Sequence, residues 1–383
     1  MDKQLPHKQQ LLSTVRRVVL KVGSSILSTA DGIDRVRLRR LSDEIHMLRS
    51  RGYQVVLVSS GAVAAGMSRL GKRERPRTIP QKQAAAAVGQ IGLMALYEEF
   101  LGGHGHVVAQ VLLTHDDLAN RRRYINARHA FEELLQAGVV PVVNENDTVA
   151  VEEFKYNFGD NDNLSALVAT LVGADVLVIL SDVAGLCTAD PRTSADAELI
   201  PLVGDFSTEI DGYARGSAGP FGTGGMASKL DAARTTTDAG IPCIIADGLS
   251  TGILPAVFDP EESVGTLFLP KGDRLKRRKH WIAHVLRPAG TIVVDQGAYD
   301  ALAKQGRSLL PKGVVEVSGE FDAGECVSCL TPEREEFARG LVGYGSTELA
   351  RIKGVHTSEI ESLLGYNAGD AIIHRDDLVL LRS

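Results

Sequence analysis

Short apolar, β-branched runs alternate with longer helix-like stretches up to residue 246, and this alternation restricts the fold more than any other feature of the chain. Buried strands are expected at 18–22, 55–58, 107–113, 139–143, 176–180 and 241–246. Helices are expected at 34–51, 61–70, 80–101, 120–136, 164–172 and 226–239. Strands that alternate with helices form a mostly parallel sheet covered by helices on both faces. The pattern therefore predicts an α/β fold for this part of the chain.

The pattern changes near Leu269, where a basic polar run at 270–279 precedes short strands separated by glycines. A chain of 383 residues suggests about two domains. We expect a large first domain over 1–270, a linker over 271–287 and a small β-rich domain over 288–370. The basic run is interpreted as a solvated linker, with a phosphate or RNA contact as the alternative.

Composition excludes several classes of protein. With 44% hydrophobic and 23% charged residues the chain is globular in character, and no apolar run approaches the length of about 18 residues that a membrane span requires. The polar N-terminus lacks a secretory signal, which favours a cytoplasmic location. The net charge of −6 gives no general attraction to nucleic acid. The CxxC spacing at Cys326 and Cys329 is expected to lie in a strand, with a redox or zinc role as the alternative.

Polar or glycine-rich motifs directly follow four of the expected strands, at 21–25, 59–62, 144–147 and 181–185. Because the carboxyl ends of parallel strands share one edge of a sheet, these motifs should converge where open α/β sheets bind ligands. Glycine and serine there allow close backbone approach, and helix starts favour anions. A second acidic and amide cluster at 159–163 lies close in sequence to the third motif. The motifs predict a cleft for phosphate and carboxylate groups.

Lys21 is the main candidate for binding a phosphate. It ends the otherwise apolar run 18–22, where a buried ammonium is costly unless it meets an anion. The alternative is a structural salt bridge. A glycine-rich segment at 222–229, with Lys229 in the first turn of the helix expected to begin near Met226, is a second candidate phosphate element.

Familiar nucleotide and metal templates do not fit. Residues 66–72 have Walker A spacing, but Arg73 replaces the required hydroxyl, and 160–171 lacks the glycine and glutamate of a calcium loop. Segment 222–227 follows no strand, which argues against dinucleotide binding. Phosphoryl transfer needs mainly positioning and charge neutralisation. A carboxylate acceptor, ionised at neutral pH, would need no general base.

Six motifs in order resemble those of the amino acid kinase family, in particular its glutamate-phosphorylating members, which carry a C-terminal PUA domain. The motifs lie at 21–25, 59–62, 141–147, 159–165, 185–192 and 222–226. The resemblance covers nearly the whole chain and implies a helix-covered, mostly parallel sheet followed by a PUA domain. It implies ATP-dependent phosphorylation of the side-chain carboxylate of L-glutamate to L-glutamyl 5-phosphate, with Mg²⁺, as the first step of proline biosynthesis.

The resemblance also implies roles for individual residues. The catalytic residues would be Lys21, Asp160 and Asp162. ATP would be bound by Lys21, Ser181, Asp182, Thr223, Gly224, Gly225, Met226, Ala227, Ser228 and Lys229. Glutamate would be bound by Ser60, Gly61, Ala62, Asn144, Asp147 and Asn161. No side chain is assigned as a direct metal ligand.

Partners and regulation follow from the same resemblance. Family members form homo-oligomers, here a dimer or tetramer, and are inhibited by proline near the loop at 149–158. Cys187 stands where an aromatic residue is expected. The alternatives are a kinase for aspartate or N-acetylglutamate and an RNA-binding factor acting through the second domain. Residues 281–383 carry ten Lys and Arg against fifteen Asp and Glu, a net of 10 − 15 = −5, which argues against RNA.

Overall fold

The computed structural model describes residues 4–29, 32–72, 74, 76–150, 161–194, 196–213, 225–270 and 288–381. It divides into two compact units, which are described separately. The first unit comprises Met1–His115 and Phe131–Lys271, and the second comprises Asp116–Ala130 and Gly272–Ser383.

The first unit is built on an eight-stranded sheet with the order β5-β6-β4-β1-β7-β9-β10-β8. Its strands are β1 (Arg17–Val22), β4 (Gln54–Val58), β5 (Val108–Leu113), β6 (Val140–Glu145), β7 (Val176–Ser181), β8 (Leu202–Val203), β9 (Cys243–Asp247) and β10 (Thr266–Phe268). A small hairpin pairs β2 (Ser28–Thr29) with β3 (Gly32–Ile33). All neighbouring strands of the large sheet are parallel except β9 and β10. The expected mostly parallel sheet is confirmed.

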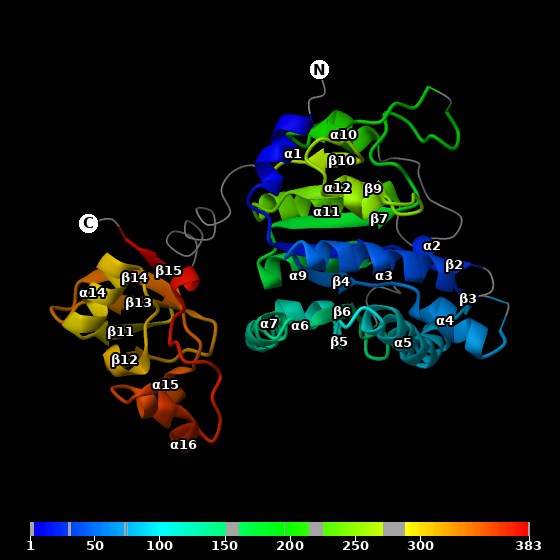
Figure 1. Ribbon diagram of the computed structural model, residues 1–383. Coiled ribbons are helices and arrows are strands. Elements are labelled where there is room, and N and C mark those ends of the chain that lie inside the picture. Colours follow the sequence, from blue (N-terminus) through cyan, green and yellow to red (C-terminus); the bar gives the residue numbers. More distant parts are fainter. Residues whose placement is uncertain are drawn as a thin grey trace. The chain divides into compact units, whose positions relative to one another are not determined.

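The helices up to residue 257 alternate with these strands (Figure 1). They are α1 (Leu5–Leu12), α2 (Ser24–Leu27), α3 (Arg35–Ser50), α4 (Ala62–Arg69), α5 (Ile79–Gly102), α6 (His115–Ala119), α7 (Arg121–Gln136), α9 (Asn161–Val172), α10 (Thr208–Tyr213), α11 (Met226–Asp238) and α12 (Ile253–Val257). Among the described helices, none has the length and apolar character needed to cross a membrane. The expected helices are present, but α9 begins at Asn161 instead of 164. The acidic cluster therefore contributes to the first turn of a helix, where Asp and Asn are favoured.

The sheet is buried on both faces. Side chains such as Leu20, Leu57 and Val178 pack in one core with residues of α3, α5 and α12. Successive strand side chains point to opposite faces, so Lys21 lies on the other face, against which α9 packs. The strands are therefore almost continuously apolar, as expected for a covered parallel sheet.

Helix α1 and its N-cap residue are attached to the rest of the first unit by hydrogen bonds to backbone carbonyls. Gln4 Nε2 lies 3.0 Å from Pro201 O and 3.3 Å from Gly265 O. The buried Lys8 ammonium donates to the carbonyls of Ala256, at 2.7 Å, and Glu262, at 2.5 Å. These contacts place the start of the chain beside the segment that leads into β10.

Helices α4 and α5 cross with their backbones in contact. A Cβ atom built on Gly66 would lie 1.7 Å from the carbonyl oxygen of Ala85, and one on Gly89 would lie 1.8 Å from that of Ala62. No side chain fits at either position. The two glycines therefore permit an approach that fixes α4 against α5.

The second unit contains a five-stranded sheet with the order β12-β11-β13-β14-β15. Its strands are β11 (Gly290–Val294), β12 (Val314–Gly319), β13 (Cys326–Leu330), β14 (Glu336–Leu341) and β15 (Leu378–Leu380), with helices α14 (Gln296–Gln305), α15 (Ser346–Ile352) and α16 (Ile360–Leu364) and 3-10 turns Pro311–Gly313, Thr357–Glu359 and Arg375–Asp377. The expected β-rich character is confirmed. Glu336 and Arg339 form an ion pair on β14. The three helices were not expected.

The CxxC cysteines lie on opposite faces of β13. Cys329 packs in the main core of the second unit, whereas Cys326 packs with Leu341 and Val379. Burial raises the pKa of the Cys329 thiol to about 12. The strand interpretation is confirmed, and the two sulfur atoms do not face a common site.

Candidate active site

The four motif-bearing strands are neighbours in the sheet. The order β6-β4-β1-β7 is parallel throughout, with Lys21 opposite Val58 and Ile179, and Val58 opposite Val143. Their carboxyl ends therefore lie on one edge. The sequence-based prediction that the motifs converge is confirmed.

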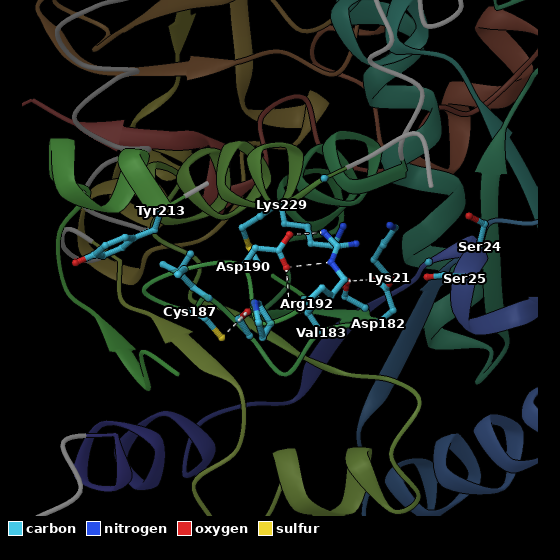
Figure 2. Close-up of a pocket in the computed structure, with 18 residues that line it drawn as sticks. Lys21, Ser24, Ser25, Asp182, Val183, Cys187, Asp190, Arg192, Tyr213 and Lys229 are labelled. Carbon is cyan, nitrogen blue, oxygen red and sulfur yellow. Dashed lines mark hydrogen bonds and ion pairs between the residues drawn. The ribbon is translucent and has the colours of Figure 1, made fainter. Parts of the chain in front are cut away.

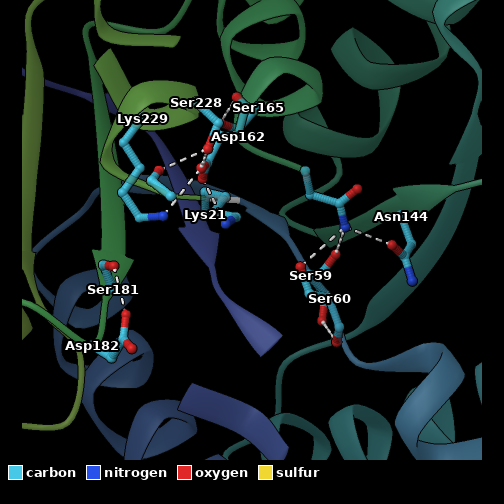
Figure 3. A network of polar contacts seen from close by, with 12 residues as sticks. Lys21, Ser59, Ser60, Asn144, Asp162, Ser165, Ser181, Asp182, Ser228 and Lys229 are labelled. Carbon is cyan, nitrogen blue, oxygen red and sulfur yellow. Dashed lines mark hydrogen bonds and ion pairs between the residues drawn. The ribbon is translucent and has the colours of Figure 1, made fainter. Parts of the chain in front are cut away.

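Asp162 joins two lysines at this edge. Its Oδ1 lies 2.6 Å from Lys21 Nζ and its Oδ2 lies 3.3 Å from Lys229 Nζ. Ser228 Oγ donates to the same Oδ2 at 2.8 Å, and Figure 3 shows these groups directed at the carboxylate. The structure thus brings together residues from β1, α9 and α11.

This cluster places charged side chains in a buried environment. Lys21 is 1% exposed and Asp162 is 0% exposed. The salt bridge considered for Lys21 exists, and its carboxylate is shared with Lys229. Buried charge is stabilised by a partner of opposite sign. A phosphate is such a partner.

A pocket lies next to the cluster (Figure 2). Among the residues that line it are six of the predicted nucleotide ligands, namely Lys21, Ser181, Asp182, Gly225, Met226 and Lys229. Ser181 Oγ lies 3.2 Å from Asp182 Oδ1, which fixes the end of β7. Ala227 and Ser228 lie in the first turn of α11 outside this lining, where Ser228 instead supports Asp162.

Asp190 and Arg192 are among the pocket residues that were not predicted as site residues. The Arg192 guanidinium forms hydrogen bonds of 3.0 and 2.9 Å with the two carboxylate oxygens of Asp190, as Figure 2 shows. These bonds hold the pKa of Asp190 below its usual range. The motif at 185–192 contains both residues but had no role assigned to it. Cys187 also lines the pocket, and burial raises the pKa of its thiol.

A neutral, buried cluster of amides and hydroxyls lies at the ends of β4 and β6. Asn161 Nδ2 donates to Asn144 Oδ1 at 2.9 Å and to Ser60 Oγ at 3.2 Å, and it also contacts Ser59 O. Figure 3 shows Ser59, Ser60 and Asn144 in this network. Three predicted substrate residues, Ser60, Asn144 and Asn161, are therefore brought together.

The remaining predicted substrate residues flank this cluster. Gly61 has a φ of 98°, which favours glycine, and serves as the N-cap of α4. Ala62 is the first residue of α4, so this helix start faces the same edge of the sheet. Asp147 lies half-buried in the turn after β6. Asp160, Thr223 and Gly224 lie outside the described residues, as do 151–158 of the loop implied in proline inhibition.

Helix α5 contributes polar contacts that no motif indicated. Gln90 Oε1 accepts a hydrogen bond of 2.8 Å from Asn144 Nδ2, and Tyr97 OH lies 2.9 Å from Ser59 Oγ. Burial raises the pKa of Tyr97 above its usual value. Their only sequence signal is a regular spacing within an alanine-rich helix.

Comparisons with known proteins agree with this architecture. The model of the amino acid kinase family matches residues 16–247, and that of the PUA domain matches 290–364. Glutamate 5-kinase of Pelobacter propionicus is 52% identical over 375 residues, covering 98% of this chain and 100% of the relative. That of Moorella thermoacetica is 52% identical over 371 residues, covering 97% of each. Among solved structures, UMP kinase from Bacillus anthracis is 18% identical with a TM-score of 0.48, covering 67% of this chain and 97% of that one.

The sheet and its helices are those of a phosphotransferase of the amino acid kinase type. Identity of about one half extends over almost the full length of the relatives. The chain belongs to the glutamate 5-kinases of the amino acid kinase family, with a C-terminal PUA domain.

Proposed function

We propose that the protein transfers the γ-phosphoryl group of ATP to the side-chain carboxylate of L-glutamate, giving L-glutamyl 5-phosphate in the first step of proline biosynthesis. One observation carries this proposal. A cluster of two lysines around Asp162 and a cluster of amides and hydroxyls around Asn161 lie at the same sheet edge, and Asn161 and Asp162 are the first two residues of one helix. The charged cluster suits a phosphate and the neutral one suits an amino acid.

The phosphate side of the site works by charge neutralisation. Lys21 and Lys229 would contact the transferring phosphoryl group, while Asp162 and Ser228 hold the lysines in place. Preorganised positive charge in a buried site stabilises charge that develops during transfer. Ser181, Asp182, Gly225 and Met226 would bind the rest of the nucleotide, and Asp160, Thr223, Gly224 and Ala227 are proposed to assist.

The acceptor side of the site, which is the cluster of amides and hydroxyls around Asn161, has to orient the substrate more than to activate it. A glutamate side chain with a pKa of about 4.3 is ionised at neutral pH, so no base must remove a proton before attack. Ser60, Asn144, Asn161 and Asp147 would bind the amino acid, with the start of α4 at Gly61 and Ala62 near a carboxylate.

Mg²⁺ fits this site as a companion of ATP. Within the described part of the chain, no group of three or more His, Cys, Asp or Glu side chains is arranged to hold a metal ion. Mg²⁺ bound to a nucleotide takes most of its ligands from phosphates and water and needs only one or two carboxylates. Asp182, which lines the pocket, is the described candidate. When bound, the ion would neutralise phosphate charge.

The proposal is tested by incubating the purified protein with ATP, Mg²⁺ and hydroxylamine. Glutamate should yield a hydroxamate together with ADP, whereas aspartate and N-acetylglutamate should yield far less. Neither product with glutamate, or equal turnover of the other acids, would show that the substrate is wrong.

Three further proposals rest on family membership. Proline is proposed as a feedback inhibitor, the chain as a dimer or tetramer, and the kinase domain as residues 1–270, separated by 271–287 from a PUA domain over 288–370. The family models, which match 16–247 and 290–364, support the division. Titrating proline into the hydroxamate assay and measuring molar mass by light scattering check the first two.

A further inference from the structure

Helix α5 presents three polar side chains at intervals of seven residues, Gln83, Gln90 and Tyr97. Seven residues are about two helical turns, so the three lie on one face. Each reaches a different part of the acceptor side: Gln83 Nε2 donates to Ala150 O at 3.2 Å, Gln90 accepts from Asn144, and Tyr97 pairs with Ser59. One face of α5 therefore contacts the segments that follow β4 and β6.

Gln90 is the central member of this row and is only partly satisfied. Its side chain is 9% exposed, and Oε1 accepts the 2.8 Å bond from Asn144. Its Nε2, however, is a buried donor with no hydrogen-bond partner among the described residues. An unpaired buried donor is unfavourable, and an apolar side chain of similar size would only exchange it for an unpaired Asn144 Nδ2. Stability alone therefore does not favour glutamine over an apolar residue at this position.

The contact of Gln90 fixes the orientation of Asn144. The Asn144 amide donates to Gln90 through Nδ2 and accepts from Asn161 through Oδ1. The Glu145 backbone N–H also donates to Asn144 Oδ1 at 3.0 Å, so the amide oxygen is held from two sides and Gln90 holds the nitrogen. Without the acceptor on Gln90, the amide plane could turn about this oxygen, and the bond to Asn161 would change its geometry. Asn161 in turn contacts Ser60. An amide chain thus runs from α5 through Asn144 to the residues proposed to bind glutamate.

We propose that Gln90 is a positioning residue of the acceptor site, which sets the side-chain amide of Asn144 so that Asn144 and Asn161 are preorganised for the amino acid substrate. The inference rests on the proposed function. Gln90 itself does not contact the substrate, because its Nε2 is enclosed by protein. Its role is to support the groups that do.

The test compares Gln90→Leu with wild type in the hydroxamate assay. The KM for glutamate should rise about tenfold, since small displacements of orienting groups have effects of this size or larger. The KM for ATP should change less than about twofold, because the nucleotide pocket lies elsewhere on the edge. Gln136→Leu, the same exchange at an exposed helix end, should leave both constants unchanged.

Stability separates positioning from simple packing. Gln90→Leu removes one unpaired donor, Gln90 Nε2, and creates another, Asn144 Nδ2, so the number of unpaired buried donors does not change. The Tm should therefore shift by less than about 3 °C. A large loss of Tm with parallel loss of all kinetic constants would show a structural role and overturn the inference.

A double variant tests the route through Asn144. If Gln90 acts by orienting Asn144, adding Gln90→Leu to Asn144→Ala should change the KM for glutamate by less than about twofold. Additive effects, or a wild-type KM in Gln90→Leu, would overturn the inference while the proposed function stands. If wild type itself forms no glutamyl hydroxamate, the proposed function fails and this inference fails with it.

Discussion

At the scale of residues, Asp162 determines how the two lysines of the site are held. It bonds Lys21 and Lys229 through different oxygens, and Ser165 Oγ donates to its backbone carbonyl at 2.6 Å. A single carboxylate thus fixes the positions of two cations. Both lysines also line the pocket proposed to bind the nucleotide.

Asp162→Asn should lower kcat for glutamyl hydroxamate by about 10²–10³-fold, as for the loss of other preorganised electrostatic groups. The amide keeps the shape but leaves two ammonium groups close together without their counter-charge. Ser228→Ala, which removes only a supporting hydrogen bond, is the matched comparison and should cost about tenfold or less. Equal kcat values for Asp162→Asn and wild type would contradict the role given to Asp162.

The four cysteines should react slowly in the native protein. Cys187, Cys243, Cys326 and Cys329 are buried. Burial raises the pKa of three of them, Cys187, Cys243 and Cys329, so the reactive thiolate is scarce at neutral pH and increases only as the pH rises. An Ellman titration should detect four thiols in denaturant and few without it. Four fast-reacting thiols in the native protein would contradict the described burial.

Sequence and structure agree best for residues whose chemistry is conspicuous. Lys21 was identifiable because an ammonium in an apolar strand needs an anion, and Asn161 because it belongs to a dense polar cluster. Gln90 and Tyr97 escaped detection because a glutamine or tyrosine in a helix is ordinary. Only the three-dimensional contacts with Asn144 and Ser59 distinguish them.

At the scale of elements, the crossing of α4 and α5 links two parts of the acceptor side. Helix α4 begins at Ala62, beside Ser60 and Gly61, and α5 carries Gln90 next to Gly89. Gly66 and Gly89 carry no side chains at the crossing, so the two helix backbones pack directly against each other. The start of α4 and the amide of Gln90 therefore keep a fixed spacing.

Gly89→Ala should destabilise the protein by about 2–3 kcal/mol, because its methyl group collides with the carbonyl of Ala62 and forces the helices apart. Gly92→Ala on the same helix is the control. A Cβ there would lie 3.2 Å from Arg69 Nη1, the end of a flexible side chain, so the change should be neutral or stabilising by up to about 1 kcal/mol. Urea unfolding measures both, and equal stabilities of the two variants would contradict the crossing.

The elements themselves were largely predictable, and their order in the sheet was not. Apolar runs gave the strands near 18–22 and 176–180, and the motifs at their ends gave the shared edge. The neighbours of each strand, and the antiparallel pairing of β9 with β10, depend on long-range packing. The contacts of Lys8 with backbone carbonyls leave no trace in the sequence, because carbonyls are present at every residue.

At the scale of the whole molecule, charge limits what the C-terminal PUA domain can bind. The PUA name refers to a domain of RNA-modifying enzymes, but residues 281–383 carry a net charge of 10 − 15 = −5. Binding to nucleic acid depends strongly on cationic side chains that neutralise phosphates. The full chain should therefore show only weak filter binding of structured RNA at physiological salt. Tight, salt-resistant binding would contradict this expectation.

The attachment of α1 has a consequence for how the chain can be rearranged. Gln4 contacts Gly265 and Lys8 contacts Glu262, so the first described residues lie beside the last strand of the first unit. Natural ends that lie this close can be joined by a short peptide and new ends opened in a surface loop. The catalytic unit is thus a candidate for circular permutation. A downstream module could also be added or exchanged after its final strand without changing the path of the chain through the sheet.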